Sequence, residues 1–356
     1  MKTIAYFVTD SGFGHITRST AIIKCILENS DFNVLLVCDK EQNDHAKIGL
    51  RKYEKRVSFA TADTDASSVF NANTLKVAKE KTLEAVRTYM EELEDNMYEL
   101  YDLLKGMDIS AVITDLSVLG IMIGKRLGVK VVGISNYTWY NRFKKMGMDQ
   151  DILDFYRGWY NQLDMLLKLK FSDDMSDIEC PTEEVGLVCR EVHEMSSSDF
   201  KKRYWPAVYL SVGQVEKKKE KFKINFPAGT IVATGSIEIE GDAHLVKLPA
   251  RVSHTQDYIA ACSFALIKGG WSSVAECLIL GIPFGILEQG DLSEDAELVN
   301  KLFEENLAFK TTEDELRKFN IKDMNIKTTT VNRRKFENDA VKIAARLVEL
   351  VEAPIE

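Results

Sequence analysis

Two glycine-containing segments combine residue types that bind anions and move protons. The first is the sequence GFGHITR at residues 12–18, directly after the apolar run Ile4–Val8. Gly12 and Gly14 allow a tight turn and a close approach of the backbone to a ligand. His15 can transfer a proton near neutral pH, and Arg18 can pair with a phosphate or a carboxylate. The segment therefore predicts an anion-binding turn with an acid–base group.

Two other interpretations of this segment are open. The simplest is a glycine turn that a histidine caps. The other is a dinucleotide-binding fingerprint, in which Asp39, at the end of the next strand, would bind the ribose. That fingerprint places a glycine where Thr17 stands.

The second segment is KGGWSSVAE at residues 268–276, again after an apolar run. Free N–H groups where a helix begins, together with hydroxyls, can hold a diphosphate, for which Gly269, Gly270, Ser272 and Ser273 are the candidates. Glu276 is placed to accept hydrogen bonds from sugar hydroxyls. Alternatively, Ser273 caps the helix and Glu276 completes a capping box.

Composition excludes several classes of protein. The chain has 356 residues, 45% apolar and 28% charged, with a net charge of −9. This balance is typical of a globular protein of two domains, and it argues against a sequence-independent grip on nucleic acid. No stretch approaches the roughly 20 apolar residues of a membrane span. Six scattered cysteines read as small buried hydrophobes, which favours a reducing, cytoplasmic setting.

Strand and helix patterns alternate along the first half of the chain. Apolar strand patterns end at polar or glycine residues, and helix patterns of period 3–4 follow them. We expect strands at 4–8, 34–38, 57–60, 111–114 and 130–134, with helices at 17–29, 73–105 and 119–127. Gly128 is a candidate C-cap. The segment 171–203 is polar and reads as irregular linker.

A second α/β set begins at Val208. We expect strands at 208–212, 230–234, 245–248 and 264–268, helices at 257–262, 273–280 and 294–305, and a final helix at 331–351. The predicted domains are 1–205 and 206–330, with 331–356 packing back on the first domain. Ligands of wound parallel sheets lie outside the carboxyl ends of the strands.

In this order, the two motifs resemble those of the GT-B glycosyltransferases. The branch with the UDP-N-acetylglucosamine transferase of peptidoglycan lipid assembly, and archaeal proteins of similar length, is the most similar. The stretch from Asp115 to Asn136 also resembles its first domain, whereas residues 136–205 match poorly. The resemblance implies an α/β fold of two Rossmann-like domains facing across a cleft. It also implies sugar transfer from a nucleotide diphosphate donor, with UDP as the expected nucleotide, to a hydroxyl acceptor.

The resemblance implies roles for individual residues. Gly12 and Gly14 would line the cleft opposite the donor phosphates, and His15 would act as base or bind the acceptor. Gly270, Ser272 and Ser273 would meet the diphosphate, and Glu276 the ribose. Glu294 and Asp295 fall where the family has a Glu-Gln pair facing the donor sugar. Asp295 replaces the amide of that pair and Leu298 replaces an asparagine, which puts the identity of the sugar in doubt.

Sugar transfer through an oxocarbenium-like state needs a base for the acceptor and stabilisation of the leaving diphosphate. Helix N-termini can stabilise the diphosphate without a metal or cofactor. A nucleotide-sugar hydrolase and a donor-binding protein without turnover are the alternatives. The acceptor is unknown, and a lipid-linked one would bring peripheral membrane contact.

Three weaker signals remain. The DTD spelling at 63–65 reads as a polar loop rather than a metal clamp. The aromatic and basic stretch from Tyr137 to Lys145 reads as core helix with charged flanks rather than a lipid-binding surface. His45, His193, His244 and His254 are isolated in the sequence, so no zinc site is expected.

Overall fold

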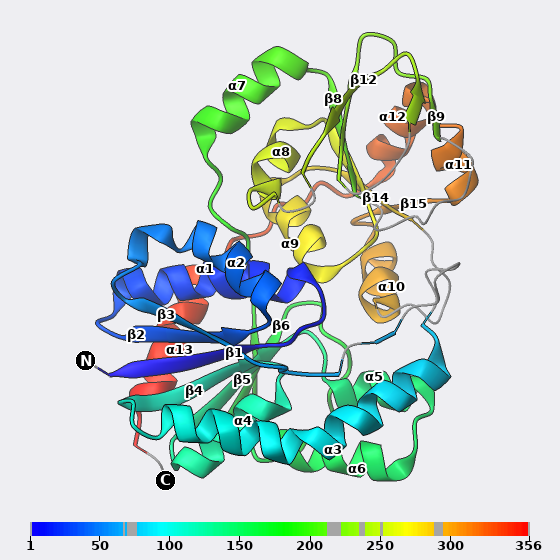
Figure 1. Cartoon of the computed structure of the whole chain (residues 1–356). Helices are drawn as coiled ribbons and strands as arrows, with labels where there is room; N and C mark the ends of the chain where they lie inside the picture. Colours follow the sequence, from blue (N-terminus) through cyan, green and yellow to red (C-terminus); the bar gives the residue numbers. More distant parts are fainter. Residues whose placement is uncertain are drawn as a thin grey trace. The chain divides into compact units, whose positions relative to one another are not determined.

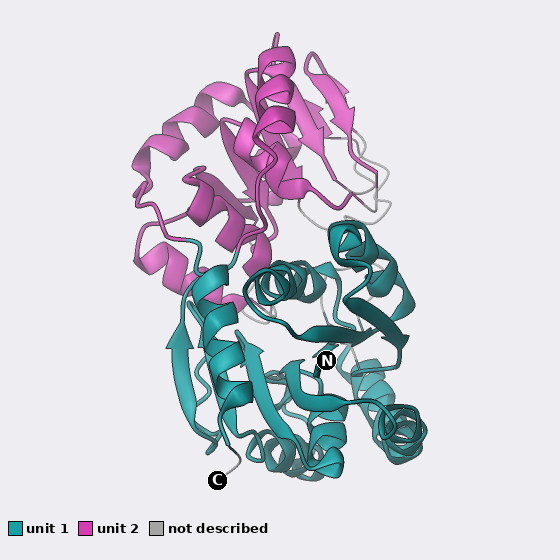
Figure 2. Cartoon of the chain, turned by 90° about the vertical axis from the view of Figure 1, so that its left-hand side faces the viewer, with its two compact units in different colours: residues 1–69, 77–188, 338–356 teal, residues 70–76, 189–337 magenta. Residues whose placement is uncertain are grey.

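The structure, a computed structural model, describes residues 2–66, 68–69, 77–211, 222–234, 239–249, 252–287 and 295–354. The chain divides into two units (Figure 2). Unit 1 contains residues 1–69, 77–188 and 338–356, and unit 2 is built on residues 189–337. The chain thus passes from unit 1 to unit 2 after residue 188, whereas the predicted domain boundary is at 205.

Unit 1 is built on a seven-stranded parallel sheet with the order β3-β2-β1-β4-β5-β6-β7. Its central strands are continuous apolar runs because both faces of the sheet are covered. The chain winds one way from β1 to β3 and the other way from β4, so the topological switch point lies between β1 and β4. The strands are β1 (Thr3–Val8), β2 (Asn33–Cys38), β3 (Val57–Thr61), β4 (Ile109–Asp115), β5 (Lys130–Ser135), β6 (Met165–Leu169) and β7 (Thr182–Val185).

Helices cover both faces of this sheet (Figure 1). One face carries α1 (Phe13–Asn29), α2 (Lys40–Gly49) and α13 (Ala340–Glu352). The other carries α3 (Lys79–Leu104), α4 (Val118–Leu127), α5 (Trp139–Met146) and α6 (Gln150–Tyr160), and a short 3₁₀ turn, η1 (Arg51–Tyr53), precedes β3. Gly128 ends α4 in the left-handed conformation, as predicted.

The aromatic stretch forms part of the core of unit 1. Trp139, Phe143 and Tyr156 are at most 1% exposed and pack ring against ring. Lys144 and Lys145 lie on the flank and pair with acidic residues. The core-helix interpretation of this stretch is therefore confirmed.

Two predictions about residues 1–205 are wrong. The first helix begins at Phe13 rather than Thr17, so His15 lies in its first turn. The supposed linker 171–203 contains β7 and helix α7 (Glu194–Tyr204). Strand β7 consists of three polar residues and the half-buried Val185. It lacks the apolar run that marks the others because it is an edge strand.

Unit 2 has a six-stranded parallel sheet with the order β12-β10-β8-β13-β14-β15. Its switch point lies between β8 and β13. The strands are β8 (Ala207–Ser211), β10 (Thr230–Ala233), β12 (His244–Lys247), β13 (Phe264–Ile267), β14 (Phe284–Leu287) and β15 (Phe309–Thr311), and a two-stranded sheet joins β9 (Phe222–Ile224) to β11 (Ile239–Gly241).

The helices of unit 2 are α7, α8 (Thr255–Ala261), α9 (Trp271–Leu280), α10 (Ala296–Glu304), α11 (Glu313–Arg317) and α12 (Ile321–Thr330). The last helix of the chain, α13, begins at Ala340, nine residues later than the predicted helix at 331–351. It contacts α1, β4 and β5 of unit 1. Its buried face, which includes Ile343 and Leu347, follows the helical period.

All six cysteines are buried and carry free thiols, which confirms their interpretation as small buried hydrophobes. Among the helices described, none is both long and apolar enough to span a bilayer.

Candidate functional site

The loop after β1 opens helix α1 at the switch point of unit 1. Gly12 is the N-cap of α1 and has φ +71°, a left-handed conformation that glycine adopts without strain. The buried Gln42 amide fixes this turn by donating to the carbonyl oxygens of Thr9, at 2.9 Å, and Gly12, at 2.8 Å. Gly14 is exposed in the first turn of the helix, where backbone N–H groups have no intrahelical partner.

His15 and Arg18 stand one turn apart on α1, so both face the end of the neighbouring strand β4. That strand ends at Asp115, whose register partner on β1 is Val8. The imidazole Nδ1 of His15 lies 3.0 Å from Asp115 Oδ1. His15 is 7% exposed and Asp115 is 1% exposed. The switch point thus holds a buried histidine–aspartate pair.

Arg18 holds the other side of the same carboxylate. Its Nε donates to Asp115 Oδ2 at 2.7 Å and its Nη2 donates to Oδ1 at 2.6 Å, a bidentate pair. Its Nη1 donates to the side-chain oxygen of Asn136, and Ser19 Oγ donates to Asp115 Oδ2. Arg18 is itself only 3% exposed. The guanidinium therefore binds a carboxylate of its own chain and fixes the position of Asp115.

Charge and burial act in opposite directions on this group. Burial by itself would raise the pKa of Asp115, but the Arg18 guanidinium and His15 outweigh it and lower that pKa to about 2. Burial, followed by the repulsion from Arg18, lowers the pKa of His15, although Asp115 opposes this. At neutral pH the pair is consequently an ionised carboxylate beside a neutral imidazole.

The tautomer of His15 decides what the imidazole can do. Its Nδ1 lies 2.8 Å from Arg18 Nη2, which can only donate, and 3.0 Å from Asp115 Oδ1, which can only accept. We assign the Nδ1 proton toward Asp115, because a charge-assisted bond to an ionised carboxylate is the stronger of the two. Nε2 then carries the lone pair of a base and accepts from the Tyr137 hydroxyl at 3.2 Å.

The corresponding loop of unit 2 follows β13. Gly269 has φ +104°, and a Cβ there would come within 3.1 Å of Ile286 and Val299. Gly270, the N-cap of α9, has the ordinary φ of −61°, and a Cβ there would meet nothing within 4 Å. The first glycine is thus required by the turn, whereas the second leaves open space where the helix begins. Ser272 and Ser273 lie half-buried in that first turn.

Glu276 forms an ion pair that the sequence did not reveal. It is 3% exposed, and its Oε1 accepts from Arg190 Nη2 at 2.7 Å and Nε at 3.1 Å. Arg190 also donates to the Ser253 carbonyl and, at 2.5 Å, to Thr255 Oγ1. Within the described ranges, Oε2 of Glu276 has no hydrogen-bond donor.

The alternative in which Ser273 and Glu276 form a capping box is wrong. Helix α9 begins at Trp271 with Gly270 as its N-cap, and no side chain caps it. Ser273 is therefore inside the first turn, and Glu276 lies a further turn along the helix. The glycine pair lets the helix begin two residues earlier than the predicted start.

The segment predicted to face the donor sugar is only partly described. Asp295 precedes α10, whereas Glu294 lies outside the described residues. Leu298 and Leu302 are at most 1% exposed and anchor α10 in unit 2. The leucine at 298 is thus a core residue.

The DTD triplet at 63–65 packs against the loop after β1. The amide and hydroxyl of Thr64 donate to the Asp10 carboxylate at 2.9 and 2.6 Å. Burial raises the pKa of Asp10 to about 6. The triplet lies in a loop, as predicted, and Thr64 and Asp65 are at most 5% exposed there.

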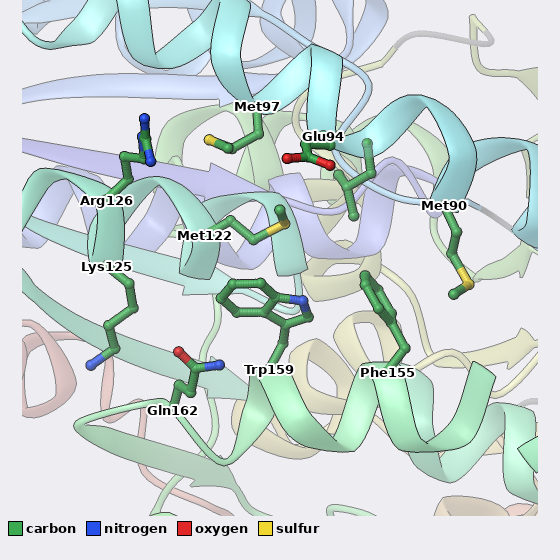
Figure 3. Close-up of a pocket in the computed structure, with 10 residues that line it drawn as sticks. Met90, Glu94, Met97, Met122, Lys125, Arg126, Phe155, Trp159 and Gln162 are labelled. Atoms are coloured by element: carbon green, nitrogen blue, oxygen red, sulfur yellow. The ribbon is translucent and has the colours of Figure 1, made fainter. Parts of the chain in front are cut away.

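Unit 1 also has an apolar pocket of about 480 Å³ between α3, α4 and α6 (Figure 3). Its walls include Met90, Met97, Met122, Phe155 and Trp159. These helices lie on the sheet face opposite α1, and the lining includes none of the predicted site residues.

The structure is similar to those of several solved glycosyltransferases. A UDP-glucosyltransferase from Polygonum tinctorium has a TM-score of 0.63 and 11% identity, covering 99% of both chains. UGT2 of Phytolacca americana, complexed with UDP-2fluoro-glucose and pterostilbene, has a TM-score of 0.61 and 14% identity over 98% of this chain and 94% of that one. The calicheamicin glycosyltransferase CalG4 has a TM-score of 0.61 and 14% identity, covering 98% of this chain and 97% of that one.

These likenesses establish the fold. The chain has the α/β architecture of two Rossmann-like parallel-sheet units found in GT-B glycosyltransferases, as predicted. The narrower resemblance to the peptidoglycan and archaeal branch stays a prediction.

Sequence comparison is less informative. No protein-family model matches the chain. L-arabinokinase of Arabidopsis thaliana is 24% identical over 317 residues, a match that covers 84% of this chain and 29% of that protein. The chain thus spans less than a third of that relative, and the activity in the relative's name belongs to the longer protein.

Proposed function

We propose that the chain transfers a sugar from a nucleotide diphosphate donor, with UDP as the expected nucleotide, to an acceptor hydroxyl. The observation that carries this proposal is the buried pair of His15 and Asp115 at the switch point of unit 1. Ligands of open parallel sheets bind at such a point, outside the carboxyl ends of the strands. The complex of UGT2 with UDP-2fluoro-glucose and pterostilbene supports a nucleotide-sugar donor and a small-molecule acceptor.

His15 acts as the general base in this proposal. Its Nε2 takes the proton of the acceptor hydroxyl while the acceptor oxygen bonds to the anomeric carbon and the bond from that carbon to the diphosphate breaks. Asp115 stabilises the imidazolium that forms, since its Oδ1 accepts from Nδ1 at 3.0 Å. Arg18 is a positioning residue, because both of its contacts to Asp115 fix the carboxylate that orients His15.

The loop before α9 binds the donor. The N–H groups at Gly270, Ser272 and Ser273 begin the helix and suit the two phosphates. Glu276 offers Oε2 to a ribose hydroxyl while Arg190 holds Oε1. Helix dipole and N–H donors stabilise the leaving diphosphate, so the proposal requires no metal ion in the transfer step.

The acceptor in this proposal is a compound with a free hydroxyl. The resemblance to the transferase of peptidoglycan lipid assembly favours a lipid-linked acceptor. The six buried free thiols support a reducing compartment such as the cytoplasm.

The test combines donor binding with product analysis. UDP-sugars, and sugars on other nucleotides, are first ranked by the rise in the apparent melting temperature that each causes. The best donor, labelled in its sugar, is then incubated with soluble and lipid-linked hydroxyl acceptors. Appearance of a labelled glycoside supports transfer. Acceptor-independent release of free sugar would identify a hydrolase, and tight binding without turnover across the panel would identify a binding protein; either result overturns the proposal.

A further inference from the structure

Two histidines that are 61 positions apart in the sequence meet at the surface of unit 2. His193 immediately precedes α7 and His254 immediately precedes α8, and these two helices pack together (Figure 1). The imidazole ring centroids are 4.9 Å apart at an angle of 79°. The two histidines are thus isolated in the sequence but adjacent in the structure.

Asp257 completes the group. Its Oδ2 accepts from His193 Nδ1 at 3.0 Å, and its Oδ1 accepts from the His193 backbone N–H at 2.8 Å. The side chain of Asp257 is 9% exposed, whereas that of His193 is 55% exposed. The carboxylate thus orients one imidazole from beneath and leaves its outer side open to solvent.

We propose that His193, His254 and Asp257 bind a divalent transition-metal ion of the zinc class. The described residues contain one group of this kind, and its ligand atoms lie within 4.8 Å of one another. In a tetrahedral zinc site, with bonds of about 2.0–2.1 Å, two ligand atoms stand about 3.3 Å apart. Side-chain rotations close this difference, because His193 is mostly exposed and the three residues already converge.

The electrostatics select the kind of ion. Both histidines lie where helices begin, and the partial positive charge there repels cations. Arg190 adds a full positive charge beside Thr255. A hard ion held by charge alone, such as Mg²⁺ or Ca²⁺, would gain little here. Imidazole nitrogens instead bind Zn²⁺, Co²⁺ or Ni²⁺ through coordinate bonds, with Asp257 supplying the compensating charge.

The ion would fasten the segment that carries Arg190. His193 lies three residues after Arg190, and His254 lies between Ser253 and Thr255, the two residues whose oxygens Arg190 also binds. Coordination would therefore connect the start of α7 to the start of α8 beside the Glu276 ion pair. The site is structural, takes no part in the transfer step, and does not depend on the proposed sugar transfer.

Metal titration of the untagged, chelator-stripped chain tests the site without any nucleotide. Co²⁺ is added as a visible probe, and Zn²⁺ then competes for it. We expect one ion per chain, a cobalt absorption that Zn²⁺ abolishes, and a higher melting temperature with Zn²⁺. His193→Ala and His254→Ala should each weaken binding by about 10–100-fold or more.

His244→Ala is the matched control, since it removes an exposed histidine of the same unit that stacks on Tyr204 instead. Melting curves without metal show whether each variant is folded, and Asp257→Asn provides a third variant at the site. Absence of saturable binding by the wild type would overturn the proposal. Binding that the double variant His193→Ala/His254→Ala retains unchanged would overturn it too.

Discussion

Each glycine loop opens a helix that carries one member of an arginine–carboxylate pair, Arg18 on α1 and Glu276 on α9, but the two pairs differ in what they leave available. Arg18 contacts both oxygens of Asp115, and His15 and Ser19 take further positions on that carboxylate. Arg190 contacts only Oε1 of Glu276. The first carboxylate is fully used inside the protein, whereas the second keeps an acceptor for another group.

Under the proposed function, this difference gives the two carboxylates different roles. A carboxylate that is saturated by its own chain positions a neighbouring imidazole and stays ionised, which suits proton transfer. A carboxylate with one unused oxygen can accept a ligand hydroxyl without losing its support. The comparison therefore predicts that mutations in unit 1 affect turnover, and that mutations at Glu276 affect binding.

His15→Ala should have the largest effect on turnover. Removing a general base costs about 10²–10⁴-fold in rate, while the donor groups of unit 2 are untouched, so nucleotide affinity should stay nearly constant. Turnover is measured with labelled donor and affinity by calorimetry, with His244→Ala as the control. Unchanged turnover would remove His15 from the mechanism.

Asp115→Asn tests the support of the base. The change leaves the buried Arg18 guanidinium without its counter-charge, and breaking a buried pair in this way costs about 3–5 kcal/mol. Urea unfolding should show this loss in the free energy of unfolding, and the folded fraction should turn over more slowly because His15 loses its orientation. A variant as stable and active as the wild type would contradict the arrangement described for this carboxylate.

Glu276→Ala tests the other half of the comparison. We expect nucleotide affinity to fall about 10–100-fold, equivalent to roughly 1.5–3 kcal/mol for hydrogen bonds to a charged group. Glu276→Gln keeps an acceptor oxygen and should retain part of the affinity, and the exposed Glu304→Gln serves as a control. If affinity is the same in all three, Glu276 only holds Arg190.

The pH dependence should also separate the two units. The lowered pKa of His15 means that the imidazole stays neutral, and able to accept a proton, down to a pH below its ordinary value of 6.5. The rate should therefore fall on acidification with a midpoint below 6.5, and binding of the intact donor should not follow that curve. A midpoint above 6.5 would show that protonation of His15 is favoured in the folded state.

The sequence was sufficient to predict the glycine loops, because each follows an apolar strand and opens a helix. It was also sufficient to predict most central strands, whose apolar runs are continuous. It could not show which residues meet across the sheet. Asp115 lies 97 positions from Arg18, and Glu276 lies 86 positions from Arg190; both pairs depend on how strands and loops are ordered in space.

The polar segment 171–203 was misread for a related reason. An edge strand such as β7 buries too little to show an apolar pattern, and α7 has no buried residue. The histidine pair before α7 and α8 was missed because the two histidines are 61 positions apart in the sequence, and because Asp257, three residues after His254, was not considered as a partner. Local sequence patterns reveal an element through its buried apolar residues, and β7 and α7 have few or none.

Tyr137→Phe should have the smallest effect and gives the finest test of the assigned tautomer. The Tyr137 hydroxyl donates to His15 Nε2, so an acceptor hydroxyl must replace it there before the proton can move. Tyr137→Phe removes a neutral hydrogen bond worth roughly 0.5–1.5 kcal/mol that the acceptor otherwise has to displace, so we expect turnover to rise by about 2–10-fold at unchanged nucleotide affinity. A loss of turnover as large as that of His15→Ala would show that the proton passes through the Tyr137 hydroxyl to His15, so that both residues act together as the base. An unchanged rate would place the acceptor at Nε2 without any displacement of Tyr137.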